Sequence, residues 1–515
     1  MLSIDAARLD TLRQQGQLTR RARRGIERES LRVTEGGDIS MRDHPKSLGE
    51  PLVHPHITLD FGEAQIEWVS SVHSSIPDML EQMRQLLAFT QSRLEPGRER
   101  LWGLSVPCPI RDEDRFLHAY SQDTRDTHQG LLAQLYRVGL RHRYGAMMQA
   151  VCGVHYNFSF PKALWPHLGV ERNEGYLAAV RNVRRHLWSL IYLYGASPLV
   201  HPTFVDKRSH RLEPVGADAL GLPGATSLRI GDLGYSSRAQ DGMGLAFNSL
   251  ESYTGEVERG LTTPWPAFVE IDRLGREAGR RLQISPAILQ LENELYAQIR
   301  LKPEVRPDVR VLDGLRRHGI GYLEIRTLDL NPFSEVGIDS EQAHFIEVLL
   351  WAGALADSPE LSGDERTRLT LEFRQISECG RDPGLVLPST GAAVPESGEA
   401  LCDALEPVAD LLDAACDQSP HRQALDAARR RFSGKLPTLS EQVIEDAKQH
   451  GGLVALGNHL ALRQRQRLLD CTSTFSAAPH EVQAAASRET LEQLRRQSAG
   501  QSFESYLQTH LLSRG

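Results

Sequence analysis

Several features that mark other protein classes are missing from this 515-residue chain. Its longest apolar run, residues 187–200, is interrupted by Ser, Gly and Pro, whereas a membrane-spanning helix needs roughly 20 apolar residues. Residues 1–21 contain no apolar core, so no secretory signal is expected. The six cysteines include no C-x-x-C pair, which argues against a disulfide framework and a structural zinc site. These absences predict a soluble cytoplasmic protein with reduced thiols.

An excess of positive charge is also missing. The chain has 59 Lys+Arg against 67 Asp+Glu, which gives a formal net charge of −8. This balance argues against a nucleic-acid partner and against binding to an anionic membrane. Aromatic residues make up only 6% of the chain, but the 40% hydrophobic and 24% charged residues are typical of a globular protein.

Motifs for several common chemistries do not occur. There is no G-x-x-x-x-G-K-[ST] phosphate loop, no H-E-x-x-H zinc helix and no G-x-S-x-G nucleophile elbow. Residues 242–247, GMGLAF, begin like a dinucleotide-binding loop but lack its third glycine and a preceding buried strand. Any phosphate chemistry in this chain must therefore rely on other side chains.

Hydrophobic periodicity divides the chain into a mixed part and a helical part. Alternating apolar and polar positions predict strands over 25–33, 56–61, 65–72, 153–160 and 321–333. Helical spacing predicts helices over 5–20, 76–98, 173–194, 246–260 and 341–357. A Gly-, Pro- and Ser-rich stretch begins near residue 380. We expect an α+β catalytic body over residues 1–360 and a mainly helical C-terminal region over residues 361–515.

Acidic side chains recur on the polar faces of the predicted strands. Glu27 and Glu29 are two residues apart, so they point to the same face of their strand. Comparable positions on other strands are occupied by Asp60, Glu67, His155, Asn157, Glu324 and Arg326. Taken singly, each acidic residue fits the solvent-facing side of an antiparallel sheet, and His155 fits a structural histidine. If the strands are neighbours in one sheet, five carboxylates and one imidazole converge.

Such a convergence of carboxylates would need compensation. Two carboxylates 4 Å apart repel each other by about 4 kcal/mol at an effective dielectric near 20. Five of them either take up protons or bind divalent cations. Oxygen ligands with one imidazole and no thiolate favour Mg²⁺ or Mn²⁺ over zinc. Bound ions of this kind could hold ATP phosphates without a phosphate loop, and Arg326 would face the transferring phosphoryl group.

Seven long segments, in order from about residue 20 to about residue 360, resemble a known family. They are RGIERESLRV, HITLDFGEAQIEWVSSV, LYRVGLRHRYGAMMQAVCGVHYNFSFP, LYGASP, ATSLRIGDLGY, LQLENELYAQIRLK and YLEIRTLDLNPFSEVGID. The chain is similar to the proteobacterial glutamate–cysteine ligases, which carry out the first step of glutathione biosynthesis. The resemblance implies a glutamine synthetase-like fold, in which a curved, mainly antiparallel sheet flanked by helices forms a funnel-shaped active site.

The resemblance also implies a metal and nucleotide site. The ligands or near neighbours of its Mg²⁺ ions are expected to be Glu27, Glu29, Asp60, Glu67, His155 and Glu324. Glu29 and Glu67 are expected to act in catalysis together with Arg326, which matches the arginine near the ATP γ-phosphate. Arg300 and Lys302, which we expect on one strand face with Tyr296, would reach the nucleotide phosphates.

The same resemblance implies two substrate subsites. Arg229 matches a residue that pairs with a substrate carboxylate. The cysteine pocket is expected to be formed by Phe61, Tyr136, Leu140, Gln149, Tyr235 and Tyr296.

The expected activity is an ATP-dependent ligation of the L-glutamate γ-carboxylate to the L-cysteine amine through a γ-glutamyl phosphate. The partners are then small molecules (L-glutamate, L-cysteine and ATP), with no nucleic acid and no membrane, and the family-level expectation is a monomer. Alternatives from the sequence are a ligase of the same scaffold that uses another amine, a guanidino phosphotransferase, and a non-catalytic protein that binds divalent ions or a metabolite.

Overall fold

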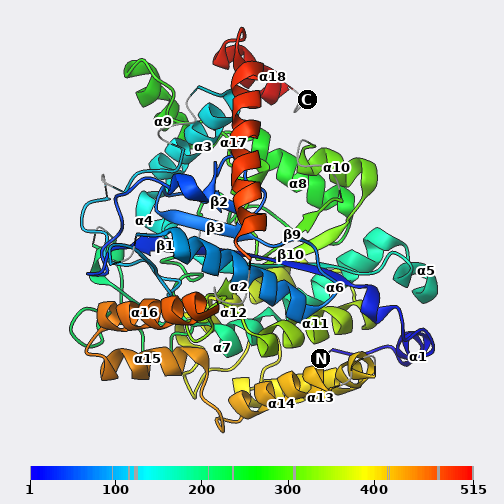
Figure 1. Cartoon of the computed structure of the whole chain (residues 1–515). Helices are drawn as coiled ribbons and strands as arrows, with labels where there is room; N and C mark the ends of the chain where they lie inside the picture. Colours follow the sequence, from blue (N-terminus) through cyan, green and yellow to red (C-terminus); the bar gives the residue numbers. More distant parts are fainter. Residues whose placement is uncertain are drawn as a thin grey trace.

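The computed structural model describes residues 2–95, 97–113, 116–120, 126–206, 208–234, 237–304, 309–414, 416, 418–471 and 476–512 (Figure 1). Its centre is an antiparallel sheet with the strand order β2-β3-β1-β5-β10-β9, and β4 also pairs with β1. The strands are β1 (Arg23–Val33), β2 (Ile57–Leu59), β3 (Gln65–Val69), β4 (Arg100–Leu101), β5 (Gly153–Ser159), β9 (Ile299–Lys302) and β10 (Tyr322–Asp329). The predicted mainly antiparallel sheet is confirmed.

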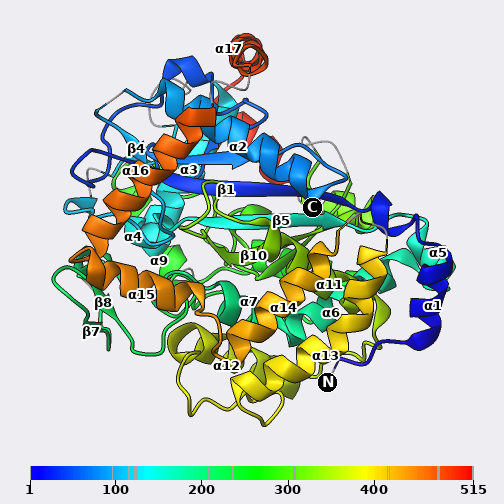
Figure 2. The same cartoon turned by 60° about the horizontal axis from the view of Figure 1, so that its bottom comes forward.

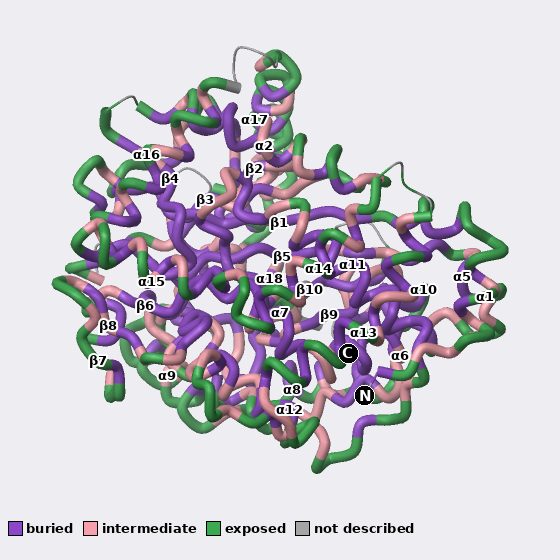
Figure 3. The backbone as a smooth tube through the Cα atoms, turned by 90° about the horizontal axis from the view of Figure 1, so that it is seen from below, coloured by how far each residue is buried: buried purple, intermediate pink, exposed green. Residues whose placement is uncertain are grey.

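Helices pack against the central sheet, and the β1 side chains that face away from the acidic pair are buried. On β1, the side chains of Ile26, Arg28 and Ser30 alternate with the acidic pair and are buried. Helix α2 (Ile76–Arg93) contacts β1 and β3, and α7 (Leu187–Tyr194) contacts β10. Figure 2 shows β1, β5 and β10 running side by side, and Figure 3 shows that they are almost entirely buried.

Several helices of the first 380 residues connect and flank these strands. They are α1 (Ala6–Gln14), α3 (His128–Tyr144), α4 (Ala146–Gln149), α5 (Leu164–Leu168), α6 (Arg172–Arg185), α8 (Leu250–Thr262), α9 (Pro266–Glu277), α10 (Val311–His318), α11 (Ser340–Leu355) and α12 (Gly363–Cys379). A small second sheet has the order β6-β8-β7, formed by β6 (Leu199–Val200), β8 (Leu220–Gly221) and β7 (Glu213–Pro214).

Some predicted boundaries were wrong. The helix expected over residues 173–194 is two helices, because the backbone of His186 (φ −116°, ψ 11°) leaves the helical region between α6 and α7. The helix expected from residue 246 begins at Leu250, where Ser249 and Ser252 form a reciprocal capping box. The strand expected through Tyr296 is shorter, because β9 begins only at Ile299.

The C-terminal region is helical, as expected. Its helices are α13 (Val394–Asp413), α14 (Pro420–Phe432), α15 (Leu439–Gln449), α16 (Leu453–Cys471), α17 (Ala478–Ser498) and α18 (Phe503–Leu512). Helices α13 and α14 contact α11, and α16 contacts α2 and β4 (Figures 1 and 2). One hydrophobic core continues from the sheet into α13, α14, α15 and α16, whereas Leu507 of α18 belongs to a separate cluster with Leu132, Leu135 and Ile284. The division near residue 360 stays a prediction. Among the described residues, no helix has the length and apolar character needed to cross a bilayer.

Candidate active site

The strand register brings the acidic side chains together. Glu29 on β1 lies directly opposite Glu67 on β3, and Glu27 lies opposite His155 on β5. On the other side of β5, Asn157 lies opposite Glu324 of β10. Directly opposed residues in an antiparallel pair have Cβ atoms roughly 5 Å apart. Three strands, β1, β3 and β10, therefore place carboxylates on one face of the sheet, and β5 adds His155 and Asn157 between them.

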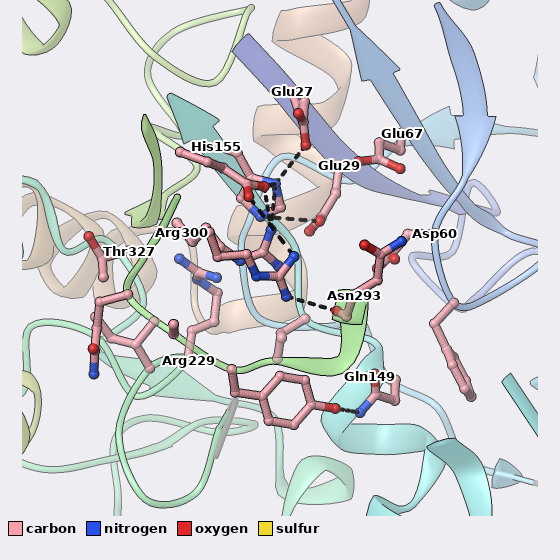
Figure 4. Close-up of a pocket in the computed structure, with 18 of the residues that line it drawn as sticks. Glu27, Glu29, Asp60, Glu67, Gln149, His155, Arg229, Asn293, Arg300 and Thr327 are labelled. Carbon is pink, nitrogen blue, oxygen red and sulfur yellow. Dashed lines mark hydrogen bonds and ion pairs between the residues drawn. The ribbon is translucent and has the colours of Figure 1, made fainter. Parts of the chain in front are cut away.

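These side chains line one cavity with a volume of about 270 Å³ (Figure 4). All predicted site residues except Tyr235 line it: Glu27, Glu29, Asp60, Phe61, Glu67, Tyr136, Leu140, Gln149, His155, Arg229, Tyr296, Arg300, Lys302, Glu324 and Arg326. Tyr235 lies outside the described residues. Further lining residues are Arg137, Val151, Ile230, Asn293, Ala297, Gln298, Thr327 and Phe373.

Glu27 is the hydrogen-bond acceptor of two side chains. His155 Nδ1 and Asn157 Nδ2 each lie 2.9 Å from a carboxylate oxygen of Glu27. Burial raises the pKa of Glu27, but the hydrogen bond from His155 opposes it, and the net pKa lies below its ordinary value. Because the ionised carboxylate only accepts, the contact to Glu27 requires a hydrogen on His155 Nδ1, and Nδ1 then does not accept from Arg326 Nη1, which lies 3.3 Å away. The lone pair of Nε2 is then available toward Glu29, whose Oε1 lies 3.7 Å away.

The pKa values of Glu29, Asp60 and Glu67 are raised, in contrast to that of Glu27. Burial, and then the charge of Asp60, raise the pKa of Glu29 to about 8. Burial raises the pKa of Asp60, and burial followed by the charges of Glu27 and Asp60 raises that of Glu67 well above its ordinary value. The protein supplies too little positive charge to keep all three carboxylates ionised, which is the condition in which a divalent cation binds.

Glu324 is surrounded by cationic side chains. Its Oε1 accepts a hydrogen bond from Arg326 at 2.6 Å, while Lys302 Nζ and Arg300 Nη1 lie 3.2 Å and 3.9 Å from Oε2. Although burial raises the pKa of Glu324, the charges of Lys302, Arg326 and Arg300 hold it well below its ordinary value. Three cations around one carboxylate leave positive charge for a further anion in the cavity.

Two groups of side chains could each hold a metal ion. Glu29, Glu67 and His155 form one group, and Glu27, His155 and Glu324 form the other, with ligand atoms within 4.8 Å of one another in each. Burial, and then the charge of Arg326, lower the pKa of His155, which favours the neutral imidazole that metals require. Figure 4 shows Glu27, Glu29 and His155 pointing toward one another.

Arg229 is fixed at the edge of the cavity by a buried ion pair. Its Nε donates to Asp329 Oδ1 at 2.6 Å and its Nη2 donates to the carbonyl of Leu328 at 2.8 Å. The other oxygen of Asp329 accepts from the Ser197 hydroxyl at 2.6 Å. Gly153 leaves room beside it, because a Cβ there would lie 2.8 Å from Arg229 Nη1 and 3.0 Å from the carbonyl oxygen of Leu328. The guanidinium is therefore held in one position.

Part of the cavity lining, the aromatic end, consists of aromatic and apolar side chains. Phe61, Tyr136 and Leu140 line it together with Gln149 and Tyr296. Gln149 Nε2 donates to the Tyr296 hydroxyl at 2.9 Å (Figure 4). Tyr296 enters the cavity from the loop that follows the 3₁₀ helix η5 (Glu292–Glu294), so the expectation of one strand face with Arg300 and Lys302 was wrong.

Sequence reasoning missed Arg137, although it lines the same cavity. Its Nε donates to the carbonyl of Asp60, its Nη2 donates to that of Leu59 at 3.0 Å, and its guanidinium lies 4.6 Å from the Tyr120 ring centroid. It thereby fixes the backbone that presents Asp60. The only available signal was its position next to Tyr136 in the segment LYRVGL.

Comparisons with known proteins agree with one another. The family model described as Glutamate-cysteine ligase matches residues 9–376. Curated glutamate–cysteine ligases of Pseudomonas putida and Pseudomonas fluorescens are 38% and 37% identical over 439 and 485 residues. These matches cover 83% and 91% of this chain and 82% and 89% of the relatives.

Solved structures extend the comparison to the whole fold. A crystal structure of the Francisella tularensis glutamate–cysteine ligase in complex with AMP has a TM-score of 0.85 at 28% identity, covering 96% of this chain and 98% of that one. A bifunctional glutathione synthetase of Pasteurella multocida shares the fold, with a TM-score of 0.72 at 22% identity, over 93% of this chain and 58% of that one. On this sequence and structural agreement, the chain belongs to the glutamate–cysteine ligase family.

Proposed function

We propose that this chain joins the γ-carboxylate of L-glutamate to the amine of L-cysteine and cleaves ATP to ADP and phosphate, as the first step of glutathione biosynthesis. The observation that carries the proposal is the single cavity, in which a carboxylate and imidazole cluster, a group of cations and an aromatic pocket meet. Membership of the ligase family supports the same conclusion.

Mg²⁺, or Mn²⁺ in its place, belongs to the proposal because the donor set fits a hard cation. The residues that would hold it are Glu27, Glu29, Asp60, Glu67, His155 and Glu324. His155 would use Nε2 beside Glu29 and Glu67, while Glu27 holds its Nδ1–H and orients the ring. A bound ion supplies neutralisation of the ATP phosphates and of the charge that develops during phosphoryl transfer.

Arg326, Arg300 and Lys302 are proposed to bind the nucleotide phosphates. Arg300 and Lys302 lie on β9, Arg326 lies on β10, and all three contact Glu324 of β10. Arg300 is also held by two backbone carbonyls: its Nε donates to that of Leu295 at 3.0 Å and its Nη2 donates to that of Asn293 at 2.8 Å. Fixed donors of this kind stabilise a transition state without reorganising, and Arg326 is assigned to the transferring phosphoryl group.

L-Glutamate and L-cysteine are proposed to occupy different parts of the cavity, a glutamate end at Arg229 and a cysteine end at the aromatic side chains. Arg229, held by Asp329, presents a guanidinium that suits a carboxylate of glutamate. The aromatic end suits the thiol-bearing side chain of cysteine. Its residues are Phe61, Tyr136, Leu140, Gln149 and Tyr296, with Tyr235 expected from the same family resemblance.

The proposed reaction has two chemical steps. A γ-carboxylate oxygen of glutamate attacks the γ-phosphorus of ATP, the bond to the β-phosphate oxygen breaks, and ADP leaves. The amine of cysteine then attacks the γ-carbonyl carbon of the acyl phosphate, phosphate leaves, and the amine gives up a proton as the amide forms. The cavity must exclude water between these steps, because the acyl phosphate is readily hydrolysed.

Measuring ADP release with each substrate omitted in turn tests this function. Release should require glutamate and be stimulated by L-cysteine, and hydroxylamine added without cysteine should yield the γ-glutamyl hydroxamate. Turnover that ignores cysteine and follows a different amine would support another ligase of this scaffold instead. Phosphorylation of a guanidine would support a phosphotransferase, and metal binding without ADP release would support a non-catalytic protein.

The wider setting follows from these substrates. The proposed function involves small molecules and needs neither a nucleic acid nor a membrane partner. Action as a monomer in the cytoplasm is part of the proposal, as is the division into a catalytic body over residues 1–360 and a helical C-terminal region, from which Phe373 reaches the cavity.

A further inference from the structure

Gln240 hydrogen-bonds the connection between β8 and α8 to the segment of Glu294 and Tyr296, near the aromatic end of the cavity. It lies in the loop between Arg229 and α8, and it is partly buried. Its Oε1 accepts from the backbone N–H of Tyr296 at 2.8 Å, and its Nε2 donates to the carbonyl of Glu294 at 2.9 Å. One side-chain amide thus pairs with two backbone groups of alternate residues, as an adjacent strand would.

Tyr296 depends on such bonds because it precedes the sheet. The segment between η5 and β9 has no strand partner at this position, since β9 pairs with β10 only from Ile299 onward. A backbone N–H that is withdrawn from water needs an acceptor. Among the bonds of the described residues, Gln240 supplies that acceptor for Tyr296.

Tyr296 also makes contacts through its side chain. Its hydroxyl accepts from Gln149 Nε2 at 2.9 Å, and its ring centroid lies 5.4 Å from that of Tyr144. Tyr144 donates at 2.7 Å to Glu294, which is fully buried. Gln240 therefore completes a frame that fixes Tyr296 at its backbone, its ring and its hydroxyl.

We propose that Gln240 is a positioning residue for the amine substrate: its amide fixes the backbone of Tyr296 and so sets the shape of the cysteine pocket. The inference rests on the proposed function, because it takes Tyr296 as part of that pocket. Arg229 and Gln240 lie on the same connection between β8 and α8, so the spacing between the glutamate end and the cysteine end depends on this connection as well. Correct spacing brings the amine to the acyl phosphate before water reaches it.

Three variants of the full-length protein test the proposal. Gln240→Ala removes both bonds, and Gln240→Glu keeps an acceptor for the Tyr296 N–H but loses the donor. Arg238→Ala is the matched control, because Arg238 is an exposed residue on the same loop. Each variant is assayed for kcat and for the KM of cysteine, glutamate and ATP, together with its Tm and the ratio of ADP released to dipeptide formed.

Gln240→Ala should raise the KM for cysteine by about tenfold, the effect of losing one or two neutral hydrogen bonds. The KM values for glutamate and ATP and the Tm should change little, and more than one ADP should be released per dipeptide. Gln240→Glu should also raise the KM for cysteine, because its carboxylate would face the Glu294 carbonyl instead of donating to it, and the Arg238→Ala control should match the wild type.

Several outcomes would overturn the proposal. An unchanged KM for cysteine in Gln240→Ala or in Gln240→Glu would do so. An equal rise in all three KM values with a lower Tm would show a merely structural role and would also overturn it. A wild-type enzyme without cysteine-dependent turnover would instead refute the proposed function, so the two failures are distinguishable.

Discussion

Replacing Glu29 by Gln separates the cost of a buried carboxylate from its use in catalysis. The Glu29 side chain is 8% exposed, and its Oε2 accepts from the backbone N–H of Gly153 at 2.9 Å. Glutamine has nearly the same shape and can keep that hydrogen bond through its amide oxygen. The substitution therefore removes a negative charge and a proposed metal ligand while leaving the packing in place.

The pKa of Glu29 gives the size of the expected effect on stability. Without a metal ion its pKa is about 8, against an ordinary value of 4.5. At pH 7 the side chain is ionised in the unfolded chain and mostly protonated in the folded one, which costs about 3 kcal/mol. The stability contributed by this carboxyl is fully present below pH 4.5 and is lost as the pH rises through 8. The glutamine variant does not show this loss.

Urea unfolding in EDTA and in Mg²⁺, at pH 7 and at pH 5, measures this effect. In EDTA at pH 7 the Glu29→Gln variant should be more stable than the wild type by about 3 kcal/mol, and the difference should shrink at pH 5. Mg²⁺ should stabilise the wild type more than the variant. Turnover of the variant should fall by about a thousandfold or more, because charge stabilisation at the phosphoryl group is lost.

Two results would refute this reasoning. A variant with near-normal turnover in Mg²⁺ would show that Glu29 takes no part in metal binding or catalysis. A variant that is less stable than the wild type in EDTA at pH 7 would show that its carboxylate is already compensated by the protein alone.

Three further expectations concern other parts of the molecule. Asp329→Asn should raise the KM for glutamate by about tenfold or more, because Arg229 is released. It should also lower the Tm, because a buried ion pair is broken. An unchanged KM for glutamate would contradict this role. Tyr296→Phe should raise the KM for cysteine by about fivefold, measured beside an unchanged KM for ATP. His421 pairs with Asp413 at 2.7 Å, and although burial opposes it, this bond raises the pKa of His421 to about 9. Its contribution of about 3 kcal/mol should be present below pH 6.5 and lost as the pH rises through 9, so unfolding of a His421→Gln variant should lack this pH dependence.

The strand faces were predictable from the sequence because their period is local. The i,i+2 spacing of Glu27 and Glu29 put both on one face, and the structure has them there. The strand order was not readable, because hydrogen bonding between β1, β3, β5 and β10 joins residues far apart in the chain. The family resemblance, which extends over ordered segments from about residue 20 to about residue 360, indicated that these strands are neighbours in one sheet.

Other features depend on contacts that leave no local signal. Asp329 ends β10 as an ordinary polar residue, and only the fold shows that it holds Arg229. Gln240 lies in a loop without periodicity, and its two bonds to the Tyr296 segment join residues 54 and 56 positions apart. His186 breaks a helix whose apolar pattern continues on both sides of it, so periodicity alone predicted one helix.

Isotope transfer from glutamate to phosphate tests the central claim most directly. L-Glutamate labelled with ¹⁸O in its γ-carboxylate is incubated with ATP, Mg²⁺ and L-cysteine, and the released phosphate is analysed by mass spectrometry. Passage through a γ-glutamyl phosphate predicts one ¹⁸O atom in each phosphate, together with stoichiometric γ-glutamylcysteine. Unlabelled phosphate released while dipeptide forms would contradict the account.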